Sequence, residues 1–248
     1  AFNSKEVKEG NIFFAIKGTN TDGNFFIRDA IRKGSKVIVS NKCKNEFKNN
    51  ILFLNHKNPR KLMAQISSKI FIKKPNNIIA VTGTNGKSSI ANFYFQILKF
   101  NKVKVASIGT LGVSGIKIKK NFSNTTFDSI QINKILKKIK ENKIDNVILE
   151  ASSHGLEQNR LHGIKFDIGI FTNFTRDHLD YHKTFRNYLD AKLILFKKLM
   201  KKKSNIIFDE DVNITKKIKK IIKKNNLNSL SIGSDNCDLK IIDHKFIN

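Results

Sequence analysis

The sequence is poor in cysteine and has no long apolar run, and each shortage limits what the protein can be. Cys43 and Cys237 are the two cysteines of the 248 residues, and they stand far apart without a CxxC pair. This spacing excludes a disulfide framework and a cysteine-rich zinc site. No apolar stretch approaches the ~20 residues of a membrane span, and no signal peptide opens the chain. We therefore expect a cytoplasmic protein without a membrane partner.

Acidic residues and arginine are also scarce. The chain has 20 acidic residues against 47 basic ones, a formal charge of +27, and only six of the basic residues are arginine. A basic surface can bind nucleic-acid phosphates, but arginine is the residue that recognises bases and phosphates in a bidentate manner. Aromatic residues do not interleave with the densest lysine runs, 197–203 and 216–224. We expect no specific nucleic-acid partner; a basic P-loop protein that binds nucleic acid remains the alternative from a different class.

The order of apolar runs and turn signals predicts an α/β fold. With 40% hydrophobic residues the chain can bury a core, and its length fits one large domain or two. Strands are expected at 11–16, 36–39 and 51–54, with helices at 26–31 and 58–71. After a hinge at 73–77, strands at 78–82, 103–108, 147–150, 166–172 and 205–208 alternate with helices at 90–98, 129–141 and 185–200. We expect a small α/β domain, residues 1–74, and then a mostly parallel sheet covered by helices, residues 75–248, with ligands at the carboxyl ends of the strands.

A glycine-flanked Gly-Lys-Ser follows the apolar run at 78–81. Gly83 and Gly86 allow a sharp turn whose backbone amides point at an anion, and no acidic residue lies between 82 and 89. Lys87 would reach the terminal phosphates of a nucleotide, and Ser88 would bind Mg²⁺. Val81 stands where the usual motif begins with glycine, so a surface turn is the competing interpretation of the short string alone. The candidate nucleotide-binding residues are Gly83, Thr84, Asn85, Gly86, Lys87, Ser88 and Ser89.

Two later strands end in polar clusters that we expect at the same edge of the sheet. The strand at 147–149 leads to Glu150, and the strand at 168–171 leads to Asp177 and His178. A carboxylate at a strand end beside a phosphate loop is in the right place for a second Mg²⁺ ligand, because the metal must bridge nucleotide and protein. Glu150 and His178 are therefore candidate metal ligands.

Other chemistries have weaker support in these clusters. The serine pair at 152–153 precedes His154, but adjacency in sequence does not place a hydroxyl on an imidazole, and no Gly-x-Ser-x-Gly elbow is present. His178 and His182 have the spacing of zinc ligands on a helix, yet the Glu of the zinc-hydrolase signature is missing. We interpret His154, His162 and His182 as structural residues.

Four blocks of the sequence resemble the ATP-dependent Mur ligases: 82–88, 124–126, 150–160, and 171–182 followed by the Ala-Lys pair at 191–192. The family's N-terminal Gly-x-x-x-Asp-Gly also occurs, at 18–23, so the likeness covers nearly the whole chain. The string Ser-Ser-His-Gly-Leu-x-Gln-x-Arg at 152–160 resembles the members that add a diamino acid.

The resemblance implies a ligase of peptidoglycan precursor synthesis. ATP would phosphorylate the free carboxylate of UDP-N-acetylmuramoyl-L-alanyl-D-glutamate, a diamino acid would attack the acyl phosphate, and an amide would form. Lys87, Glu150, His178 and Lys192 are the implied catalytic residues; Lys192, carbamylated by CO₂, would hold Mg²⁺ together with Ser88, Glu150 and His178. We expect a monomer. The residues implied to contact the UDP-sugar peptide are Ser4, Thr19, Asn20, Thr21, Asn124, Thr125, Thr126, Ser152, Gln158 and Arg160.

The sequence departs from the family in two places. The family's Asp-Ser-Arg is Asn3-Ser4-Lys5 here, which replaces a planar fork by a point charge near the uridine. The family's C-terminal domain and the later part of its central domain have no counterpart, so we expect a fragment that does not complete the reaction. The choice between meso-diaminopimelate and L-lysine stays open. A ligase of the folylpolyglutamate or cyanophycin synthetase type is the alternative enzyme, against which the N-terminal glycine block and the Gln158, Arg160 pair argue.

Overall fold

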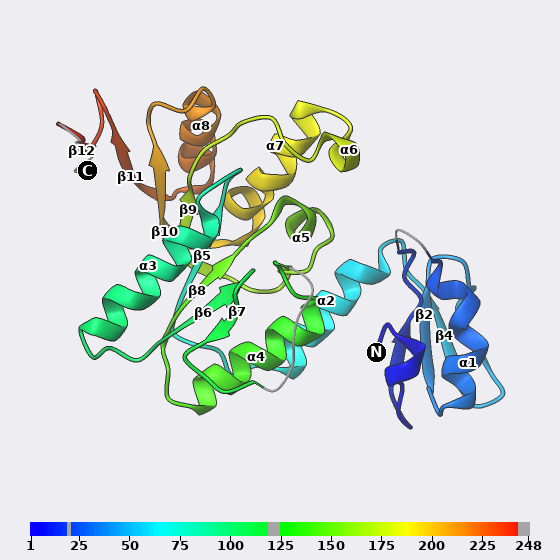
Figure 1. Cartoon of the computed structure of the whole chain (residues 1–248). Helices are drawn as coiled ribbons and strands as arrows, with labels where there is room; N and C mark the ends of the chain where they lie inside the picture. The colour runs from blue at the N-terminus through cyan, green and yellow to red at the C-terminus, as the bar shows by residue number, and fades with distance from the viewer. Residues whose placement is uncertain (19–20, 119–124, 243–248) are drawn as a thin grey trace. The chain divides into compact units, whose positions relative to one another are not determined.

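The computed structural model describes residues 1–18, 21–118 and 125–242 (Figure 1). The chain divides into two compact units, Ala1–Ile70 and Phe71–Asn248. The expected small α/β unit and the larger parallel-sheet unit are both present. Among the described residues, no helix is both long and apolar enough to cross a membrane.

The first unit holds a four-stranded sheet in the order β1-β2-β4-β3. The strands β1, β2 and β4 are parallel, and Phe13 of β1 and Ile38 of β2 are fully buried in the core of this unit. Strand β3 pairs antiparallel with β4 at the edge of the sheet. The sequence analysis missed β3 because its three residues are all exposed and carry no apolar pattern. The elements are the 3-10 turns η1 (Ser4–Glu6) and η2 (Gly23–Phe26), β1 (Ile12–Phe14), α1 (Ile27–Arg32), β2 (Val37–Ser40), β3 (Glu46–Lys48), β4 (Ile51–Asn55) and α2 (Pro59–Ile70).

The second unit holds an eight-stranded sheet in the order β12-β11-β10-β9-β5-β8-β6-β7, parallel except for the β6–β7 pair. Its strands are β5 (Asn77–Thr82), β6 (Val105–Gly109), β7 (Gly112–Ser114), β8 (Asn146–Glu150), β9 (Phe166–Phe171), β10 (Met200–Asp209), β11 (Asn228–Gly233) and β12 (Leu239–Lys240). Its helices are α3 (Lys87–Phe100), α4 (Ser129–Glu141), α5 (Ser153–Glu157), α6 (Leu179–His182), α7 (Phe185–Ile194), the π-helical turn η3 (Leu195–Leu199) and α8 (Thr215–Asn225).

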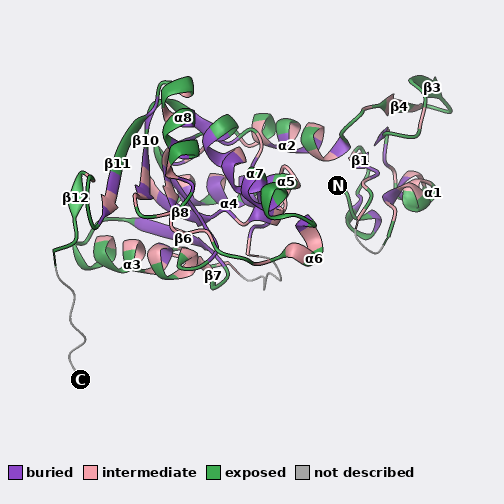
Figure 2. Cartoon of the chain, turned by 90° about the horizontal axis from the view of Figure 1, so that it is seen from above, coloured by how far each residue is buried: buried purple, intermediate pink, exposed green. Residues whose placement is uncertain are grey.

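The two faces of this sheet have separate cores. Ile78 and Ala80 of β5 point into the larger core, to which α4, α7 and α8 contribute, whereas Ile79 and Val81 point to the side of α3. Figure 2 shows the central strands as buried, with helices on either side of them. Because successive side chains of a strand face opposite sides, a strand covered on both faces must be apolar throughout. The continuous apolar run at 78–81 has this origin.

Two details differ from the sequence analysis. The helix expected at 185–200 ends at Ile194; the π-helical turn follows, and Met200 already belongs to β10, whose register shifts before Asn205. On α3, Phe93 and Ile97 are 60% and 61% exposed, because the helix packs on the sheet through Ala91 and its neighbours instead. Apolar spacing thus predicted both helices, but it placed the end of the helix at 185–200 too late and assigned the wrong buried face to α3.

Candidate functional site

The carboxyl ends of four neighbouring strands build the candidate site of the second unit. Strands β9, β5, β8 and β6 are adjacent and parallel, so the segments that follow them meet at one edge of the sheet (Figure 1). These segments are the glycine loop after β5, Glu150 at the end of β8, the turn at 110–111 after β6, and residues 172–178 after β9. The edge of the sheet predicted to bind ligands therefore collects these polar segments in one place.

The glycine loop between β5 and α3 has backbone angles at which other residue types would be strained. Gly83 has a φ of +147°, and a Cβ there would lie 1.9 Å from Oγ1 of Thr172; Gly86 has a φ of +82° and precedes the first residue of α3. The free amides at the start of α3 open into this loop, and Ser89 lies in that first turn. The loop geometry therefore fits a phosphate group.

The segment after β9 holds this loop in place. The amide of Thr84 donates to the carbonyl of Asn173 at 3.0 Å, and the amide of Asn85 donates to the side-chain oxygen of Asn173 at 2.9 Å. The Thr172 hydroxyl donates to the Asn85 carbonyl at 2.6 Å. Thr84 is itself buried, and its hydroxyl accepts from the amide of Thr175. The loop is thus braced before any ligand binds.

Two lysines converge on the carbonyl of Gly83. The Nζ of Lys87 donates to it at 3.0 Å and to the Thr84 carbonyl at 2.6 Å, and the Nζ of Lys192 donates to it at 2.5 Å. Burial lowers the pKa of Lys87, an effect that the charges of Glu150 and Asp177 oppose. The Lys87 ammonium beside the loop creates a positive environment for an anion.

Lys192 is one of the most buried side chains of the protein. It is 1% exposed, and its Nζ lies 4.3 Å from the centre of the Tyr188 ring. Burial, together with the charge of Lys87, lowers its pKa to about 7. A large share of the amine is therefore neutral near neutral pH, unlike that of a surface lysine.

Ser88 and Glu150 form a pair of oxygen ligands. The Ser88 hydroxyl donates to Oε2 of Glu150 at 2.9 Å, and Glu150 is 3% exposed. A hydroxyl and a carboxylate are the hard oxygen donors that Mg²⁺ prefers, so the pair fits this metal. The sequence analysis foresaw both residues but not Gly109 and Thr110, which also contact Glu150: a Cβ on Gly109 would lie 2.0 Å from Oε1.

His178 lies apart from this oxygen pair. It is half exposed, its Nε2 lies 3.4 Å from Oδ2 of Asp177, and its ring contacts those of His154 and Tyr188. Within the described residues, no hydrogen bond or ion pair joins it to Glu150, and no group of three or more His, Cys, Asp or Glu side chains could hold a metal. The predicted metal-binding role of His178 therefore stays a prediction.

Most of the predicted substrate residues that the structure describes form one hydrogen-bonded group. The Thr126 hydroxyl donates to the backbone carbonyl of Glu150 at 2.9 Å and accepts from the Ser152 amide at 2.9 Å. Arg160 donates to the Thr126 carbonyl at 2.6 Å and, through Nε and Nη2, to Oε1 of Gln158 at 3.2 and 2.9 Å. Thr125 contacts Thr110, and the predicted Asn124 lies outside the described residues.

Two contacts of α6 were not foreseen. The Gln158 amide donates to the Tyr181 hydroxyl at 3.1 Å, so Tyr181 helps to orient the partner of Arg160. Nε2 of His182 lies 2.9 Å from the Ser153 hydroxyl, and both side chains are buried, so this serine is not an accessible nucleophile. Neither contact has a sequence signal, because both depend on how α6 packs against α5.

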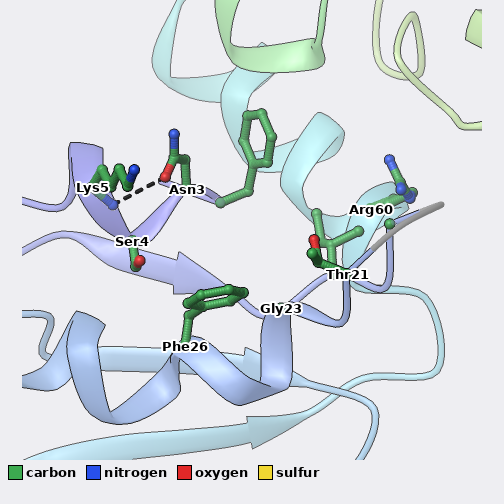
Figure 3. A pocket seen from close by; sticks show the side chains of 10 residues that line it. Asn3, Ser4, Lys5, Thr21, Gly23, Phe26 and Arg60 are labelled. Atoms are coloured by element: carbon green, nitrogen blue, oxygen red, sulfur yellow. Dashed lines mark hydrogen bonds between the residues drawn. The ribbon is translucent and has the colours of Figure 1, made fainter.

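The first unit has its own cavity of about 350 Å³ (Figure 3). Aromatic and polar side chains line it together, a combination that suits a nucleoside carrying phosphates. Among the predicted residues, Ser4 and Thr21 are in the lining, and Thr19 and Asn20 lie outside the described residues. Arg60, which the sequence analysis missed, reaches the cavity from α2. The lining consists of Phe2, Asn3, Ser4, Lys5, Ile16, Gly18, Thr21, Gly23, Phe26 and Arg60.

Comparisons with known proteins show the family of the chain. A family model for the Mur ligase middle domain matches residues 81–247, and one for the Mur ligase family catalytic domain matches residues 1–82. The UDP-N-acetylmuramoyl-L-alanyl-D-glutamate--2,6-diaminopimelate ligase of Rickettsia montanensis is 38% identical over 252 residues, 97% of this chain and 52% of its own length.

Solved structures show the same likeness. One titled as the structure of a UDP-N-acetylmuramoyl-L-alanyl-D-glutamate--2,6-diaminopimelate ligase has a TM-score of 0.79 at 29% identity, covering 95% of this chain and 48% of its own. The MurF ligase of Thermotoga maritima in complex with ADP has a TM-score of 0.62 at 20% identity, covering 96% of this chain and 51% of its own, and it shows the shared fold.

The chain spans about half the length of the curated relatives it matches. The middle-domain match alone covers more than half of the chain, and it includes the glycine loop, Glu150 and Lys192. The resemblance found in the sequence blocks is confirmed: the chain belongs to the Mur ligase family.

Proposed function

We propose that this chain supplies the UDP-sugar-binding and phosphate-binding parts of an ATP-dependent ligase that adds diaminopimelate to UDP-N-acetylmuramoyl-L-alanyl-D-glutamate. The observation that carries the proposal is the meeting, at one sheet edge, of a phosphate loop, the Ser88–Glu150 oxygen pair and an arginine held by Gln158. The names of the relatives support diaminopimelate as the added residue. They argue against the L-lysine that the sequence left open.

The loop residues 83–89 would bind the phosphates of ATP through their amides, with Lys87 on the terminal phosphates. Ser88 and Glu150 would hold Mg²⁺, with His178 and Lys192 as further ligands. When bound, the metal would neutralise phosphate charge and orient the phosphoryl group. The oxygen donors and the Lys87 ammonium beside the loop support this assignment.

Phosphoryl transfer to a carboxylate requires both the phosphate loop and Arg160 of the second unit. A carboxylate is a poor acyl donor until it carries a phosphoryl leaving group, and bringing a carboxylate to a polyphosphate needs positive charge to offset the repulsion. Lys87 supplies that charge on the nucleotide side. On the other side, Arg160 would bind a carboxylate of the dipeptide, because a guanidinium forms paired hydrogen bonds with carboxylates.

Lys192 would act as a carbamate. Carbamylation by CO₂ needs a neutral amine, and the lowered pKa of about 7 supplies one near neutral pH. The product carries a negative charge and two oxygens, which suit Mg²⁺, whereas an ammonium would repel the metal. The burial of Lys192 beside the glycine loop supports this modification over an ordinary helix lysine.

In the first unit, the cavity would bind the UDP moiety. Phe26 offers an aromatic face at its wall, while Lys5 and Arg60 supply positive charge for the diphosphate (Figure 3). Arg60 provides the planar guanidinium that the family's N-terminal motif carries at the position of Lys5 here. The planar fork that is absent at Lys5 is therefore supplied to the cavity by Arg60.

A thermal-shift experiment tests the proposal against nucleic-acid binding. We expect UDP-N-acetylmuramoyl-L-alanyl-D-glutamate to raise the melting temperature of the chain, because a ligand at about 100 times its Kd stabilises the folded state by about 2.7 kcal/mol. Single-stranded DNA at moderate salt should leave it unchanged, because screening weakens contacts with surface lysines. A shift with DNA alone would reject the ligase proposal in favour of the basic P-loop alternative.

Glu150→Gln separates the metal site from the sugar site. The substitution keeps the shape but removes the charge, so we expect the Mg²⁺ concentration needed for half-maximal ADP binding to rise roughly tenfold. The affinity for UDP-N-acetylmuramoyl-L-alanyl-D-glutamate should change less than about twofold. Glu157→Gln, an exposed glutamate on α5, is the matched control. Identical Mg²⁺ titrations for the Glu150 variant and the wild type would remove Glu150 from the metal site.

A further inference from the structure

Thr110, the residue just after β6, contacts both parts of the candidate site, and nothing above gives it a role. Its side chain lies between Glu150, the proposed metal ligand, and Thr125, a proposed substrate residue. An exposed threonine in a turn needs no partners for stability, so two polar contacts of one hydroxyl at a strand end are informative. The inference below rests on the proposed function.

Thr110 fixes both oxygens of the Glu150 carboxylate. Its backbone amide donates to Oε1 at 2.8 Å, and its hydroxyl donates to Oε2 at 3.2 Å. Ser88 donates to the same Oε2 at 2.9 Å. The preceding residue must be small for this approach, because a Cβ on Gly109 would clash with Oε1. The carboxylate is therefore held in one orientation by donors from two segments, the turn after β6 and the first turn of α3.

The same hydroxyl reaches the substrate residues. Oγ1 of Thr110 lies 3.1 Å from Oγ1 of Thr125. The next residue, Thr126, is tied to the backbone of Glu150 and accepts from Arg160. The Thr110 hydroxyl is the donor toward both acceptors, and because it carries one proton it can donate either to Oε2 of Glu150 or to Oγ1 of Thr125. The side chain of Thr110 thus joins the carboxylate to the segment 125–126.

We propose that Thr110 is a positioning residue that sets the Glu150 carboxylate and the 125–126 segment at a fixed separation. The residue does not itself touch the reacting atoms. Its amide and hydroxyl orient the metal-binding carboxylate, and the contact with Thr125 keeps the carboxylate-binding group of Arg160 in register with it. Supporting contacts of this kind decide how well a metal ligand is oriented.

Three variants test the proposal with Mn²⁺ as a paramagnetic probe in place of Mg²⁺. Thr110→Val keeps the shape and the amide but loses the hydroxyl, and Thr110→Ser keeps the hydroxyl. Thr215→Val removes a hydroxyl at the start of α8, far along the chain, and is the matched control. The Kd of Mn²⁺ is measured by electron paramagnetic resonance at saturating ADP, and the Kd of UDP-N-acetylmuramoyl-L-alanyl-D-glutamate by calorimetry.

We expect Thr110→Val to weaken Mn²⁺ binding roughly tenfold, because a hydrogen bond to a charged group is lost. The UDP-sugar peptide should bind about threefold more weakly, since Thr125 loses its partner. Thr110→Ser should stay within about twofold of the wild type in both titrations, and Thr215→Val should not change either. The melting temperatures of the two Thr110 variants should be close to that of the wild type, because Thr110 is exposed.

Wild-type Mn²⁺ affinity in Thr110→Val would overturn the inference, and so would equal losses in the serine and valine variants, which would assign the effect to packing. If the wild-type chain binds neither Mn²⁺ with ADP nor the UDP-sugar peptide, the proposed function fails, and the inference fails with it. The two failures are distinguishable, because the first requires wild-type binding.

Discussion

Replacing Lys87 with alanine should lower the affinity of the chain for ADP with Mg²⁺ by roughly a hundredfold or more. The Lys87 ammonium now bonds to the carbonyls of Gly83 and Thr84 within the loop, at the place where phosphates would bind. Its removal takes away the charge that offsets those phosphates, while the amides of the loop remain. Calorimetric titration with ADP measures the loss.

The same variant should melt close to the wild-type temperature. Burial already lowers the pKa of Lys87, which means that its charge is costly in the folded state, so little stability is lost with it. Lys99→Ala is the control, because Lys99 is an exposed lysine of the same helix. Equal ADP affinity in the Lys87 variant and the wild type would exclude the loop as the phosphate site.

Lys192 should make the stability of the chain rise with pH. Its pKa is about 7 in the folded protein and 10.5 as the ordinary value, so between these limits the unfolded state binds the additional proton. The decrease in the free energy of unfolding that this pKa difference causes is fully present below pH 7, and it disappears as the pH rises toward 10.5. From pH 7 to pH 9, wild type should gain about 2 kcal/mol relative to Lys192→Met, which has no titrating amine.

Urea unfolding of both proteins in CO₂-free buffer measures this difference at each pH. Lys220→Met, at an exposed position on α8, controls for the loss of one positive charge from a strongly basic chain. A difference between wild type and Lys192→Met that stays constant with pH would mean that the buried amine keeps its proton. In that case the amine would not be available for carbamylation, and Lys192 would be an ordinary protonated lysine.

The periodicity of the sequence was sufficient for the fold class and for one half of the site. The apolar run at 78–81, the glycine loop and the helical spacing after it predicted β5 and α3, because local geometry determines all three. The position of Ser88 and Glu150 at the same end of the sheet also follows from sequence, since parallel strands bring their carboxyl ends together. Their direct contact depends on β8 lying beside β5. These features depend on secondary structure and on the general architecture of parallel sheets.

Thr110, Tyr181 and Arg60 could not be predicted in the same way. Thr110 meets Glu150 because β6 lies beside β8, and strand order is not encoded in hydrophobic spacing. Tyr181 meets Gln158 through the packing of α6, and Arg60 lines the cavity from a helix far from the glycine block. Side chains that act through tertiary neighbours leave no local signal in a single sequence.

The helix expected at 185–200 was predicted too long for a related reason. The apolar residues Leu193, Phe196 and Leu199 keep a helical spacing, and all three are buried in the larger core. The chain satisfies this pattern with a π-helical turn over Leu195–Leu199 and then enters β10 at Met200. The sequence pattern indicates which side of the segment is buried, but it does not indicate where α-helical hydrogen bonding changes to the π-helical kind.

Calorimetric titration of the wild-type chain with UDP-N-acetylmuramoyl-L-alanyl-D-glutamate, alongside UDP-N-acetylmuramoyl-L-alanine, tests the central claim most directly. The proposed function predicts one binding site per chain and an affinity at least about tenfold higher for the ligand that carries the glutamate. The alanine ligand ends in a carboxylate one residue nearer the sugar, and it lacks the glutamate carboxylates, one of which Arg160 would bind. Absence of binding, or equal affinity for the two ligands, would contradict it.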